Sequence, residues 1–397
     1  MKNEPIAVGR PSFLRHTNAL RVLKLLRERG SCSKADLVRA SGLSAPTITN
    51  VVGDLLSAGL VKPLGEGESN GGRPPDIIAF KAERGYVLAV KITVESISFL
   101  LADLNGGQLD THEVPLAQRK TTPDAICTLI GDEVRRVLRK HKKRREQLLA
   151  LVVGVPAITN VDEGIVLAIS TLDGWRSVPL RAKLNKIVDC LVIVENNINL
   201  AAQGERYRGA AQKEDTFILI HIGSNVGAGI VLGGQTHHGA QWSAGEIDYL
   251  RLPSTSRKRP TVHEFGELET LLGSAGILES WHEARKAVDG QETMDASGVL
   301  DLAQAGDGRA EKILQHRTAI VADIVVNLSL ILNPGLILLE GKIGSHPALI
   351  AGVERQLQDS EFAAPKISAG KLGDTSVLWG GVAIALEEVP SVLLPNP

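Results

Sequence analysis

Residues 31–61 of this 397-residue chain read SCSKADLVRASGLSAPTITNVVGDLLSAGLV, and this stretch decides how the N-terminal part folds. Ser33, followed three residues later by Asp36, is a variant of the capping box that begins a helix. That short helix, Lys34–Ala40, ends at a glycine-containing turn of the length found in helix-turn-helix motifs. Ser44 then caps a further helix with a proline in its first turn, where the missing N–H costs nothing.

This last helix carries an apolar stripe and, off that stripe, small and amide side chains. Its apolar positions recur at helical spacing, at Ile48, Val51, Val52, Leu55 and Leu56. Thr47, Thr49 and Asn50 lie off the stripe; asparagine can read adenine, and threonine can bond base edges or phosphate in a major groove. The pattern by itself leaves open an ordinary three-helix bundle whose outer face is solvated.

The flanking segments favour DNA contact. An amphipathic helix is expected from about Leu14 to Arg29, and a glycine-rich loop between two short strands follows the quoted stretch, which is the pattern of a wing. Arg73 stands between two glycines and two prolines and is placed to enter a minor groove. The alternative is a flexible linker that contains an arginine. The predicted DNA-binding residues are Ser44, Ala45, Thr47, Thr49, Asn50 and Arg73.

Charge is distributed unevenly, although the formal net charge is only −1. Residues 1–82 hold 12 Lys and Arg against seven Asp and Glu, whereas the remainder holds 32 against 38. A basic module is therefore joined to an acidic body. This asymmetry indicates an anionic partner for the first part only.

Neither a membrane nor a secreted location is indicated. No uninterrupted apolar run reaches the roughly 18–20 residues of a membrane span, and the polar N-terminus has no signal-peptide core. Cys32, Cys127 and Cys190 stand far apart, without the spacing of a disulfide framework or a metal knuckle. We expect a cytoplasmic protein.

From about residue 83, short strands alternate with helices. Strands are expected at 86–91, 97–101, 149–153, 191–194, 216–222 and 229–232, and helices near 123–145 and 197–208. This order fits a two-lobed α/β body. The basic stretch 135–145 favours a solvated helix face over a second DNA contact. Two glycine-rich segments, 223–229 and 339–344, lack P-loop spacing and are weak evidence for phosphate binding.

Short motifs are spread along the whole chain. They are Leu43-Ser44…Thr47 with Gly71-Gly72-Arg73-Pro74, Gly154-Val155-Pro156, Gly174-Trp175, Val194-Glu195-Asn196-Asn197, Gly227-Ala228-Gly229-Ile230 and Ala244-Gly245-Glu246-Ile247. Through them the chain resembles the ROK family, which comprises transcriptional repressors, uncharacterised reading frames and sugar kinases. The repressor members join a winged helix-turn-helix to a kinase-like body.

The resemblance implies an α/β fold: an N-terminal winged helix-turn-helix followed by a two-lobed, actin-like (ribonuclease H-like) ATPase body. We expect the DNA-binding domain at 1–82 and the first lobe at 83–195. The second lobe, at 196–375, is expected to bind an effector and to mediate oligomerisation. A C-terminal helix at 376–390 is expected to return to the first lobe.

Two departures from the family's kinases concern catalysis. Those kinases have an Asp-x-Gly-Gly-Thr phosphate-binding hairpin after the first strand, whereas residues 91–95 here read Lys-Ile-Thr-Val-Glu. Side chains and a glutamate at this turn would obstruct and repel ATP. The general base of the kinases is the Asp of a Glu-Asn-Asp triplet, and Asn197 stands there; an amide cannot accept the sugar hydroxyl proton. We expect no catalytic residue, no cofactor and no enzyme activity.

A third departure concerns zinc, which many family members hold with a His in Glu-Ile-Gly-His and three clustered cysteines. Here the first motif reads Glu246-Ile247-Asp248-Tyr249, and no cysteine follows Cys190. A zinc site of that type is therefore excluded. We expect no metal, and His237, His238 and His263 are expected to be ordinary polar residues.

The family's sugar pocket is half retained. Three positions keep the residues with which the family hydrogen-bonds sugar hydroxyls, and three replace the usual Asn, Asp and His. The retained residues are Asn196, Glu246 and Glu269, and the replacements are Thr171, Asn197 and Tyr249. We predict that these six bind an effector, because two carboxylates and two amides can hold a polyol or modified sugar. The alternative is that the glutamates serve loop packing without a ligand.

Together these observations favour a DNA-binding transcriptional regulator, expected to be a repressor, whose operator affinity responds to a carbohydrate-like effector. Its expected partners are a double-stranded operator, a small carbohydrate or derivative, and further copies of the chain as a homodimer or dimer of dimers, with no membrane. Two other functions are weighed: a sugar kinase with an added DNA module, and a ligand-free DNA-binding dimer.

Overall fold

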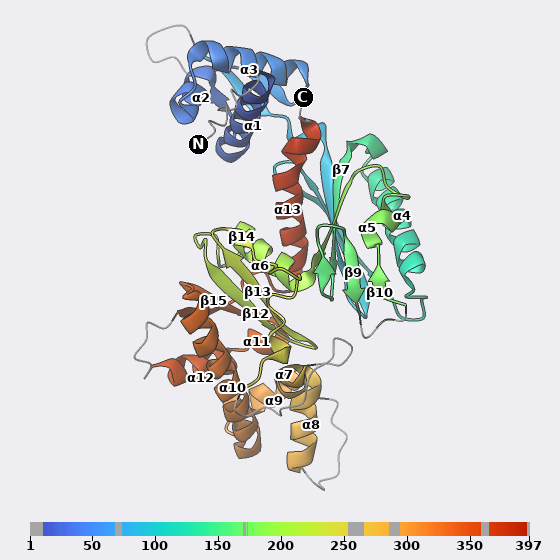
Figure 1. Ribbon diagram of the computed structural model, residues 1–397, viewed down its shortest axis with the longest axis vertical. Coiled ribbons are helices and arrows are strands. Elements are labelled where there is room, and N and C mark those ends of the chain that lie inside the picture. Colours follow the sequence, from blue (N-terminus) through green and yellow to red (C-terminus); the bar gives the residue numbers. More distant parts are fainter. Residues whose placement is uncertain are drawn as a thin grey trace, which may run out of the picture.

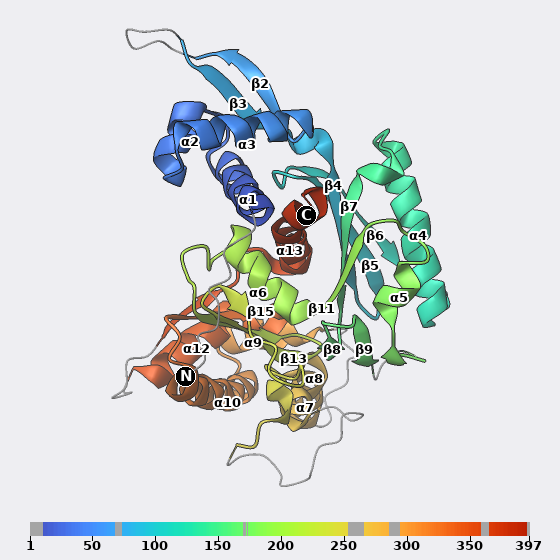
Figure 2. The same cartoon turned by 45° about the horizontal axis from the view of Figure 1, so that its top comes forward.

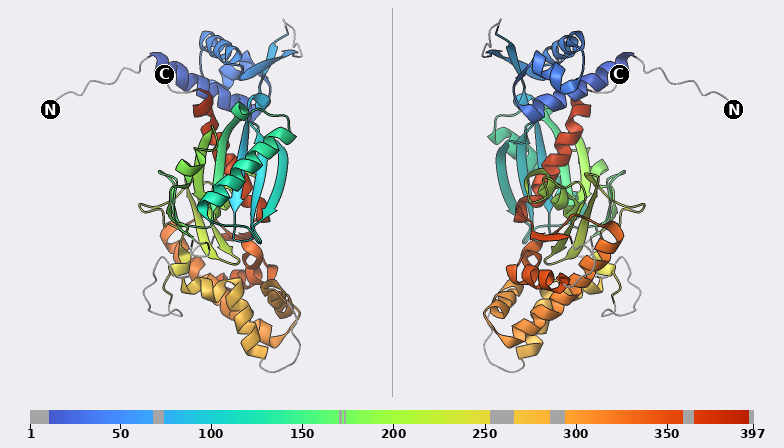
Figure 3. Two further views of the ribbon diagram at one scale, coloured as in Figure 1. Left: turned by 90° about the vertical axis from the view of Figure 1, so that its right-hand side faces the viewer. Right: turned by 90° about the vertical axis from the view of Figure 1, so that its left-hand side faces the viewer.

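The computed structural model describes residues 11–67, 74–169, 172, 174–252, 266–285, 294–358 and 365–394. These residues form an elongated molecule (Figure 1). A small helical domain lies at one end, a first α/β lobe follows, and a helical part of the second lobe lies at the other end (Figure 3).

The N-terminal domain consists of a three-helix core and a small sheet of order β1-β3-β2. The elements are α1 (Pro11–Arg29), β1 (Cys32–Ser33), α2 (Lys34–Ser41), α3 (Ala45–Ser57), β2 (Val61–Glu66) and β3 (Asp76–Phe80). The predicted capping box is present: Asp36 N donates to the Ser33 hydroxyl, and Ser33 N donates to the Asp36 carboxylate. Gly42 ends α2 at φ 68°, a conformation that a side chain disfavours. The predicted helix-turn-helix is confirmed.

The stripe predicted on α3 is narrower in the structure than in the sequence. Ile48, Val51, Val52 and Leu55 are buried, but Leu56 is 38% exposed. Leu56 is exposed because α1 and α2 cover only one side of α3, and Leu56 lies at the border of that side. The rest of the helix surface faces solvent.

The first lobe is a sheet of order β11-β7-β4-β5-β6. Its strands are β4 (Tyr86–Ile92), β5 (Ser96–Asp103), β6 (Gln108–Pro115), β7 (Leu148–Val155) and β11 (Leu191–Asn196). The strands β4, β7 and β11 run parallel, and β4, β5 and β6 form an antiparallel meander. Helices α4 (Pro123–Lys140) and α5 (Leu180–Leu184) pack on one face of the sheet, and α13 (Ser376–Leu393) packs on the other.

The helix predicted near 123–145 ends earlier, at Lys140. His141 caps it, Lys142 adopts a left-handed φ of 55°, and the chain then turns into β7. Long-range contacts cause this end, because the His141 ring and the Lys140 ammonium both bind the buried carboxylate of Asp110, each at 2.7 Å. Only the first part of the basic stretch 135–145 is therefore helical.

Smaller elements complete the first half of the chain. A three-stranded sheet of order β10-β9-β8 lies beyond β7. Its strands are β8 (Thr159–Asn160), β9 (Ile165–Ala168) and β10 (Arg176–Val178). In both halves of the chain, the described residues also form short 3-10 helices: η1 (Ala82–Arg84), η2 (Arg145–Gln147), η3 (Ile247–Tyr249) and η4 (Gly373–Thr375).

The second lobe is a sheet of order β14-β13-β12-β15-β16. Its strands are β12 (Phe217–Ile222), β13 (Val226–Leu232), β14 (Gln235–Thr236), β15 (Leu336–Glu340) and β16 (Lys366–Ala369). One face carries α6 (Asn197–Arg208). The helices that build the core on the other face are α7 (Glu267–Leu272), α8 (Ser274–Arg285), α9 (Ala296–Gln304), α10 (Gly308–Leu332), α11 (Gly341–Gly344) and α12 (Pro347–Leu357).

Helices α6 and α13 cross between the two sheets (Figure 2). Glycines bring the two backbones together: a Cβ at Gly204 would overlap the carbonyl of Ser376, and one at Gly380 would overlap that of Leu200. Glu205, which is fully buried on α6, accepts a hydrogen bond from Leu372 N at 2.7 Å. The two helices therefore form one tightly packed unit.

Among the described residues, one helical segment, Gly373–Leu393, is long and apolar enough to cross a membrane by length and composition alone. Within it, 61% of the apolar window is buried inside the protein. Two acidic residues, Glu387 and Glu388, interrupt its apolar composition. Its packing between the first sheet and α6 is that of a core helix.

Candidate functional site

The face of α3 that points away from the core presents the predicted DNA-binding residues. Ser44, Ala45, Thr49 and Asn50 are exposed, and Thr47 is half-buried. The Ser44 hydroxyl accepts a hydrogen bond from Thr47 N and lies 2.8 Å from the Thr47 hydroxyl, so this pair caps the helix. Among the described residues, no side chain or backbone group hydrogen-bonds the Asn50 amide, which leaves all its donors and acceptors available to a base edge.

The strands β2 and β3 form the base of the predicted wing. They pair antiparallel, with a bulge between Pro63 and Gly65, and Gly67 N donates to Pro75 O at 2.8 Å where the described part of the wing ends. Arg73, the predicted minor-groove residue, lies outside the described residues. Helix α3 and the strands β2 and β3 lie next to each other at the outer end of the molecule (Figure 2).

The turn between β4 and β5 lies where the family's kinases bind ATP phosphates. Here Thr93 N donates to Ser96 O at 2.9 Å, and Ser96 N donates to the Thr93 hydroxyl at 3.0 Å. The turn therefore uses these two N–H groups internally, and it exposes Val94 and the Glu95 carboxylate. These residues do not fit a nucleotide phosphate, which needs free N–H donors and no opposing charge.

Asn197 occupies the position of the kinases' general base at the start of α6. Its amide NH₂ donates to Ile92 O at 2.9 Å, and its oxygen is buried with no hydrogen-bond donor among the described residues. Neighbouring Asn196 caps α6, because its side-chain oxygen accepts from Ile198 N at 2.7 Å while its NH₂ donates to Ala157 O. Asn197 thus connects β4 to α6 and offers no group that can take up a proton.

The buried Glu195 pairs with the half-buried His238, a contact that the sequence did not predict. The Glu195 carboxylate lies 2.7 Å from His238 Nε2, and the hydrogen bond raises the pKa of His238 above its ordinary value. The other carboxylate oxygen accepts from Asn196 N and from the Asn199 side chain. This network fixes the first turn of α6. Glu195 belongs to a quoted motif, but nothing in the sequence indicated its partner.

Three carboxylates lie together around η3 and α7. Burial, and then repulsion from Asp248 and Glu269, raises the pKa of Glu246 to about 7. Burial also raises the pKa of Glu269 to about 7 and that of Asp248 to about 6, despite hydrogen bonds from backbone N–H groups. Burial, aided by the same carboxylates, raises the pKa of Tyr249 to about 12. Among the described residues, no cation is one of the groups that shift these pKa values.

The structure brings five of the six predicted effector residues into one neighbourhood. Ala228 N donates to Gly245 O at 2.8 Å, and a Cβ at Gly227 would touch Ile198 and come within 3.8 Å of Gly245 O. The start of α6, with its two asparagines, therefore lies beside the loop that carries Glu246 and Tyr249. The sixth residue, Thr171, lies outside the described residues. Sequence reasoning missed Asp248 as a member of this cluster, although it stands where the family motif has glycine.

Asp248 also connects η3 to the start of α7, close to where the family holds zinc. Its carboxylate accepts from Gly266 N at 3.2 Å, and a Cβ at Gly266 would overlap the backbone of Asp248. Among the described residues, no group of three or more His, Cys, Asp or Glu side chains can hold a metal ion. The residues present, with Tyr249 in place of the family's His, do not fit zinc.

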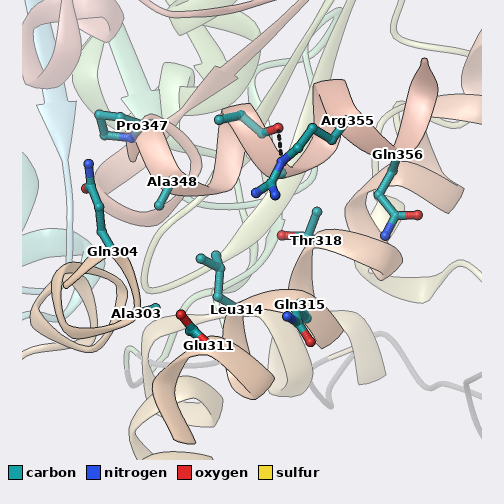
Figure 4. Close-up of a pocket in the computed structure, with 12 residues that line it drawn as sticks. Ala303, Gln304, Glu311, Leu314, Gln315, Thr318, Pro347, Ala348, Arg355 and Gln356 are labelled. Carbon is teal, nitrogen blue, oxygen red and sulfur yellow. Dashed lines mark hydrogen bonds between the residues drawn. The ribbon is translucent and has the colours of Figure 1, made fainter. Parts of the chain in front are cut away.

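Two cavities lie elsewhere on the body. One of about 840 Å³ opens between α9, α10 and α12, and Figure 4 shows the side chains that line it, among them Thr318 and Arg355. The other, of about 490 Å³, lies between β11, α5 and α13. Neither cavity is lined by a predicted effector residue. The candidate effector site is therefore defined by its polar side chains and not by a cavity of this kind.

A winged helix that exposes a polar face, joined to a two-lobed α/β body, is the architecture of a class of DNA-binding regulators. The ROK family model matches residues 87–388, and a winged helix-turn-helix DNA-binding model matches residues 15–62. The chain belongs to the ROK family, as a DNA-binding transcriptional regulator.

Individual relatives agree with this assignment. The xylose repressor of Bacillus spizizenii is 24% identical over 382 residues, which cover 95% of this chain and 96% of the relative. The repressor Mlc of Escherichia coli is 26% identical, with 85% of this chain and 83% of the relative covered. A glucokinase of Halalkalibacterium halodurans is 27% identical and covers only 77% of this chain, although 97% of the glucokinase is matched.

Solved structures agree on the fold. A ROK-family transcriptional regulator described as a homologue of Escherichia coli Mlc superposes with a TM-score of 0.80 at 21% identity, covering 96% of this chain and 98% of that structure. A ROK hexokinase from Thermus thermophilus superposes with a TM-score of 0.64 at 25% identity, covering 77% and 99%. The predicted fold class is confirmed.

Proposed function

We propose that the chain is a transcriptional repressor whose operator binding changes when a carbohydrate-like effector binds a body that has no kinase activity. The observation that carries this proposal is Asn197. Its amide NH₂ is hydrogen-bonded to Ile92 O, at the position where a kinase of this family needs an ionisable base. Similarity to a xylose repressor along nearly the whole chain supports the repressor assignment.

The proposal assigns roles to the two predicted residue sets. Ser44, Ala45, Thr47, Thr49 and Asn50 of α3, with Arg73 of the wing, contact the operator. Asn196, Asn197, Glu246, Tyr249 and Glu269, with Thr171, hold the effector through acceptors suited to sugar hydroxyls. The chain acts as a homodimer or dimer of dimers on a pseudo-palindromic operator. A cytoplasmic location belongs to the same proposal, because the protein must reach DNA.

The proposal keeps the domain boundaries expected from the sequence: 1–82 for DNA binding, 83–195 with helix 376–390 for the first lobe, and 196–375 for the second lobe. The continuous apolar core that joins α13 to the first sheet supports the return of that helix. Limited proteolysis followed by mass spectrometry tests these boundaries. Cuts should fall near 82–85 and not within the sheet strands.

The testing experiment measures operator binding by gel shift, with and without neutral sugars, amino sugars, sugar phosphates and polyols, D-xylose among them. Glu246→Ala should bind the operator like wild type and lose the response to the active compound. Calorimetry with the same compounds measures effector binding directly. If no compound binds, or if Glu246→Ala responds normally, the effector site lies elsewhere or does not exist.

A sugar kinase with an added DNA module is the second candidate, because a glucokinase is among the relatives. An ATP-consumption assay with the same sugars separates the two candidates. Sugar-dependent ATP turnover that disappears when residues of the body are substituted would establish the kinase instead.

A further inference from the structure

The DNA-binding domain docks on the C-terminal end of α13. In two views, α1 lies beside the last turns of α13 (Figures 1 and 2). The buried side chains of the three N-terminal helices, such as Leu23 and Leu26, belong to the same apolar cluster as Leu386 and Val389 of α13. The winged helix and the body therefore share one core.

Arg27 of α1 makes a polar contact at this junction. Its Nη1 donates to the carbonyl of Leu386 on α13 at 2.7 Å, and its guanidinium lies 6.0 Å from the centre of the Phe80 ring on β3. Burial lowers the pKa of Arg27, against the favourable fields of Tyr207, Glu28 and Glu387. Because the Arg27 guanidinium is held between α13 and β3, it restrains rotation of α1 relative to α13.

Apolar packing, more than polar contact, attaches the domain to the body. The Arg27–Leu386 hydrogen bond joins α1 directly to α13. Further links belong to the connecting segment: Lys62 Nζ pairs with Glu83 at 2.8 Å, and Lys81 N donates to Leu60 O. A domain attached mainly by apolar contact and one covalent segment can still change its angle.

Helix α13, which receives the contact, is anchored to the body at its other end. Near the base of α13, Trp379 stacks under Arg208 of α6, with 3.9 Å between the guanidinium carbon and the ring centre. Arg208 also donates to Gly106 O at 2.6 Å, which ties α6 to the turn between β5 and β6. Because α13 is packed into the body in this way, whatever holds α1 on α13 orients the DNA-binding domain relative to the whole body.

We propose that Arg27 is a positioning residue, which sets the angle of the DNA-binding domain on the body and so fixes the half-site spacing that the assembled regulator accepts. The inference rests on the proposed function, because it assumes an oligomer that reads two half-sites. Simultaneous engagement of both sites requires matched geometry and is lost when the geometry forbids it. Arg27 does not touch DNA in this proposal; it acts through α1 and α3.

The test uses the full chain and an operator selected in vitro from random DNA. Fluorescence anisotropy then measures affinity for this operator and for versions with up to about ten inserted base pairs, one helical turn. Wild type should lose about 100-fold in affinity at a half-turn insertion, where only one half-site can be engaged. Arg27→Met keeps the unbranched apolar stem and removes the hydrogen-bond donor. The affinity of this variant should fall less than about tenfold at the same half-turn insertion.

Three controls separate positioning from folding. Arg21→Ala changes an exposed arginine of the same helix and should keep the wild-type spacing profile. Arg27→Lys retains a donor and should recover part of that profile. Circular dichroism and hydrogen exchange of α1 check that each variant is folded. If Arg27→Met unfolds, Arg27→Lys replaces it in the comparison. The spacing profile of Arg27→Lys should then lie between that of wild type and a profile in which affinity does not depend on spacing.

The outcomes distinguish the two proposals. An operator that is selected, and a folded Arg27→Met whose spacing profile equals that of wild type, overturns the positioning role alone. Wild type that tolerates every spacing also overturns it. If no operator can be selected, the repressor proposal fails and the positioning role fails with it.

Discussion

Substituting Glu246 by glutamine should stabilise the protein at neutral and higher pH and have little effect near pH 4.5, the ordinary pKa of a glutamate. The reason is the raised pKa of Glu246, about 7 in the folded protein against an ordinary 4.5. Below 4.5 this carboxyl is protonated in both the folded and the unfolded chain. Between pH 4.5 and pH 7 the unfolded chain releases this proton while the folded protein retains it, so stability falls across this window and levels off above pH 7.

The size of the effect follows from that shift. About 1.4 kcal/mol per pKa unit gives a penalty of roughly 3 kcal/mol at pH 8 and less than about 1 kcal/mol at pH 5. The glutamine side chain would carry no charge in either state, so the free energy of unfolding of Glu246→Gln minus that of wild type should grow by about 2.5 kcal/mol between pH 5 and pH 8.

Urea denaturation of both proteins at each pH measures this difference, because urea itself does not titrate. Glu146→Gln, at an exposed position outside the cluster, serves as the matched control and should show a flat difference. If the Glu246→Gln difference is also flat from pH 5 to pH 8, the carboxylates do not share a buried environment and the site described above is wrong.

Three further predictions address other parts of the molecule. Asn50→Ala should relax base specificity, and Arg73→Ala should weaken binding mainly at A·T-rich flanks, each by about 1–3 kcal/mol in a gel-shift series; wild-type behaviour of both would contradict the assignment of the reading face. Ser33→Ala removes the cap of α2 and should lower stability by about 1 kcal/mol in a denaturant titration, whereas an unchanged midpoint would mean that the cap is dispensable. Metal analysis of the purified protein should find no stoichiometric zinc, and a chelator should leave the melting temperature unchanged; a chelator-dependent drop would show that other ligands bind the metal.

Local features of this fold were predictable from sequence. The caps at Ser33 and Ser44 depend on residues within one helical turn, and both are present. The alternation of strands and helices in the body likewise follows from short-range hydrophobic periodicity. The length of the helix that begins at Pro123 was overestimated from the sequence. The end of this helix depends on Asp110, which is distant in sequence and adjacent in space.

The candidate effector site was predictable only in part. Asn196, Asn197, Glu246, Tyr249 and Glu269 were identified through motifs, but their burial and mutual repulsion depend on how α6, η3 and α7 meet. The same holds for Arg27, which reads as a solvated arginine on an amphipathic helix. Only the return of α13 to the N-terminal end gives it an acceptor, at Leu386. The Arg27–Leu386 contact joins residues 359 positions apart, and no local pattern specifies it.

The crossing of α6 and α13 at Gly204 and Gly380 has a mechanical consequence. The second lobe is entered through α6 and left through α13, so this crossing is the natural pivot for any rotation between the lobes. From Gly380 to the end of α13 is 13 residues, a lever arm of roughly 20 Å at 1.5 Å per residue. Because α13 is packed on the first sheet, its tip moves with the first lobe, and a rotation of about 5° between the lobes would displace the tip by roughly 1.7 Å relative to the second lobe. Hydrogen bonds tolerate only a few tenths of an ångström, so a motion barely visible at the glycines would be large at the base edges.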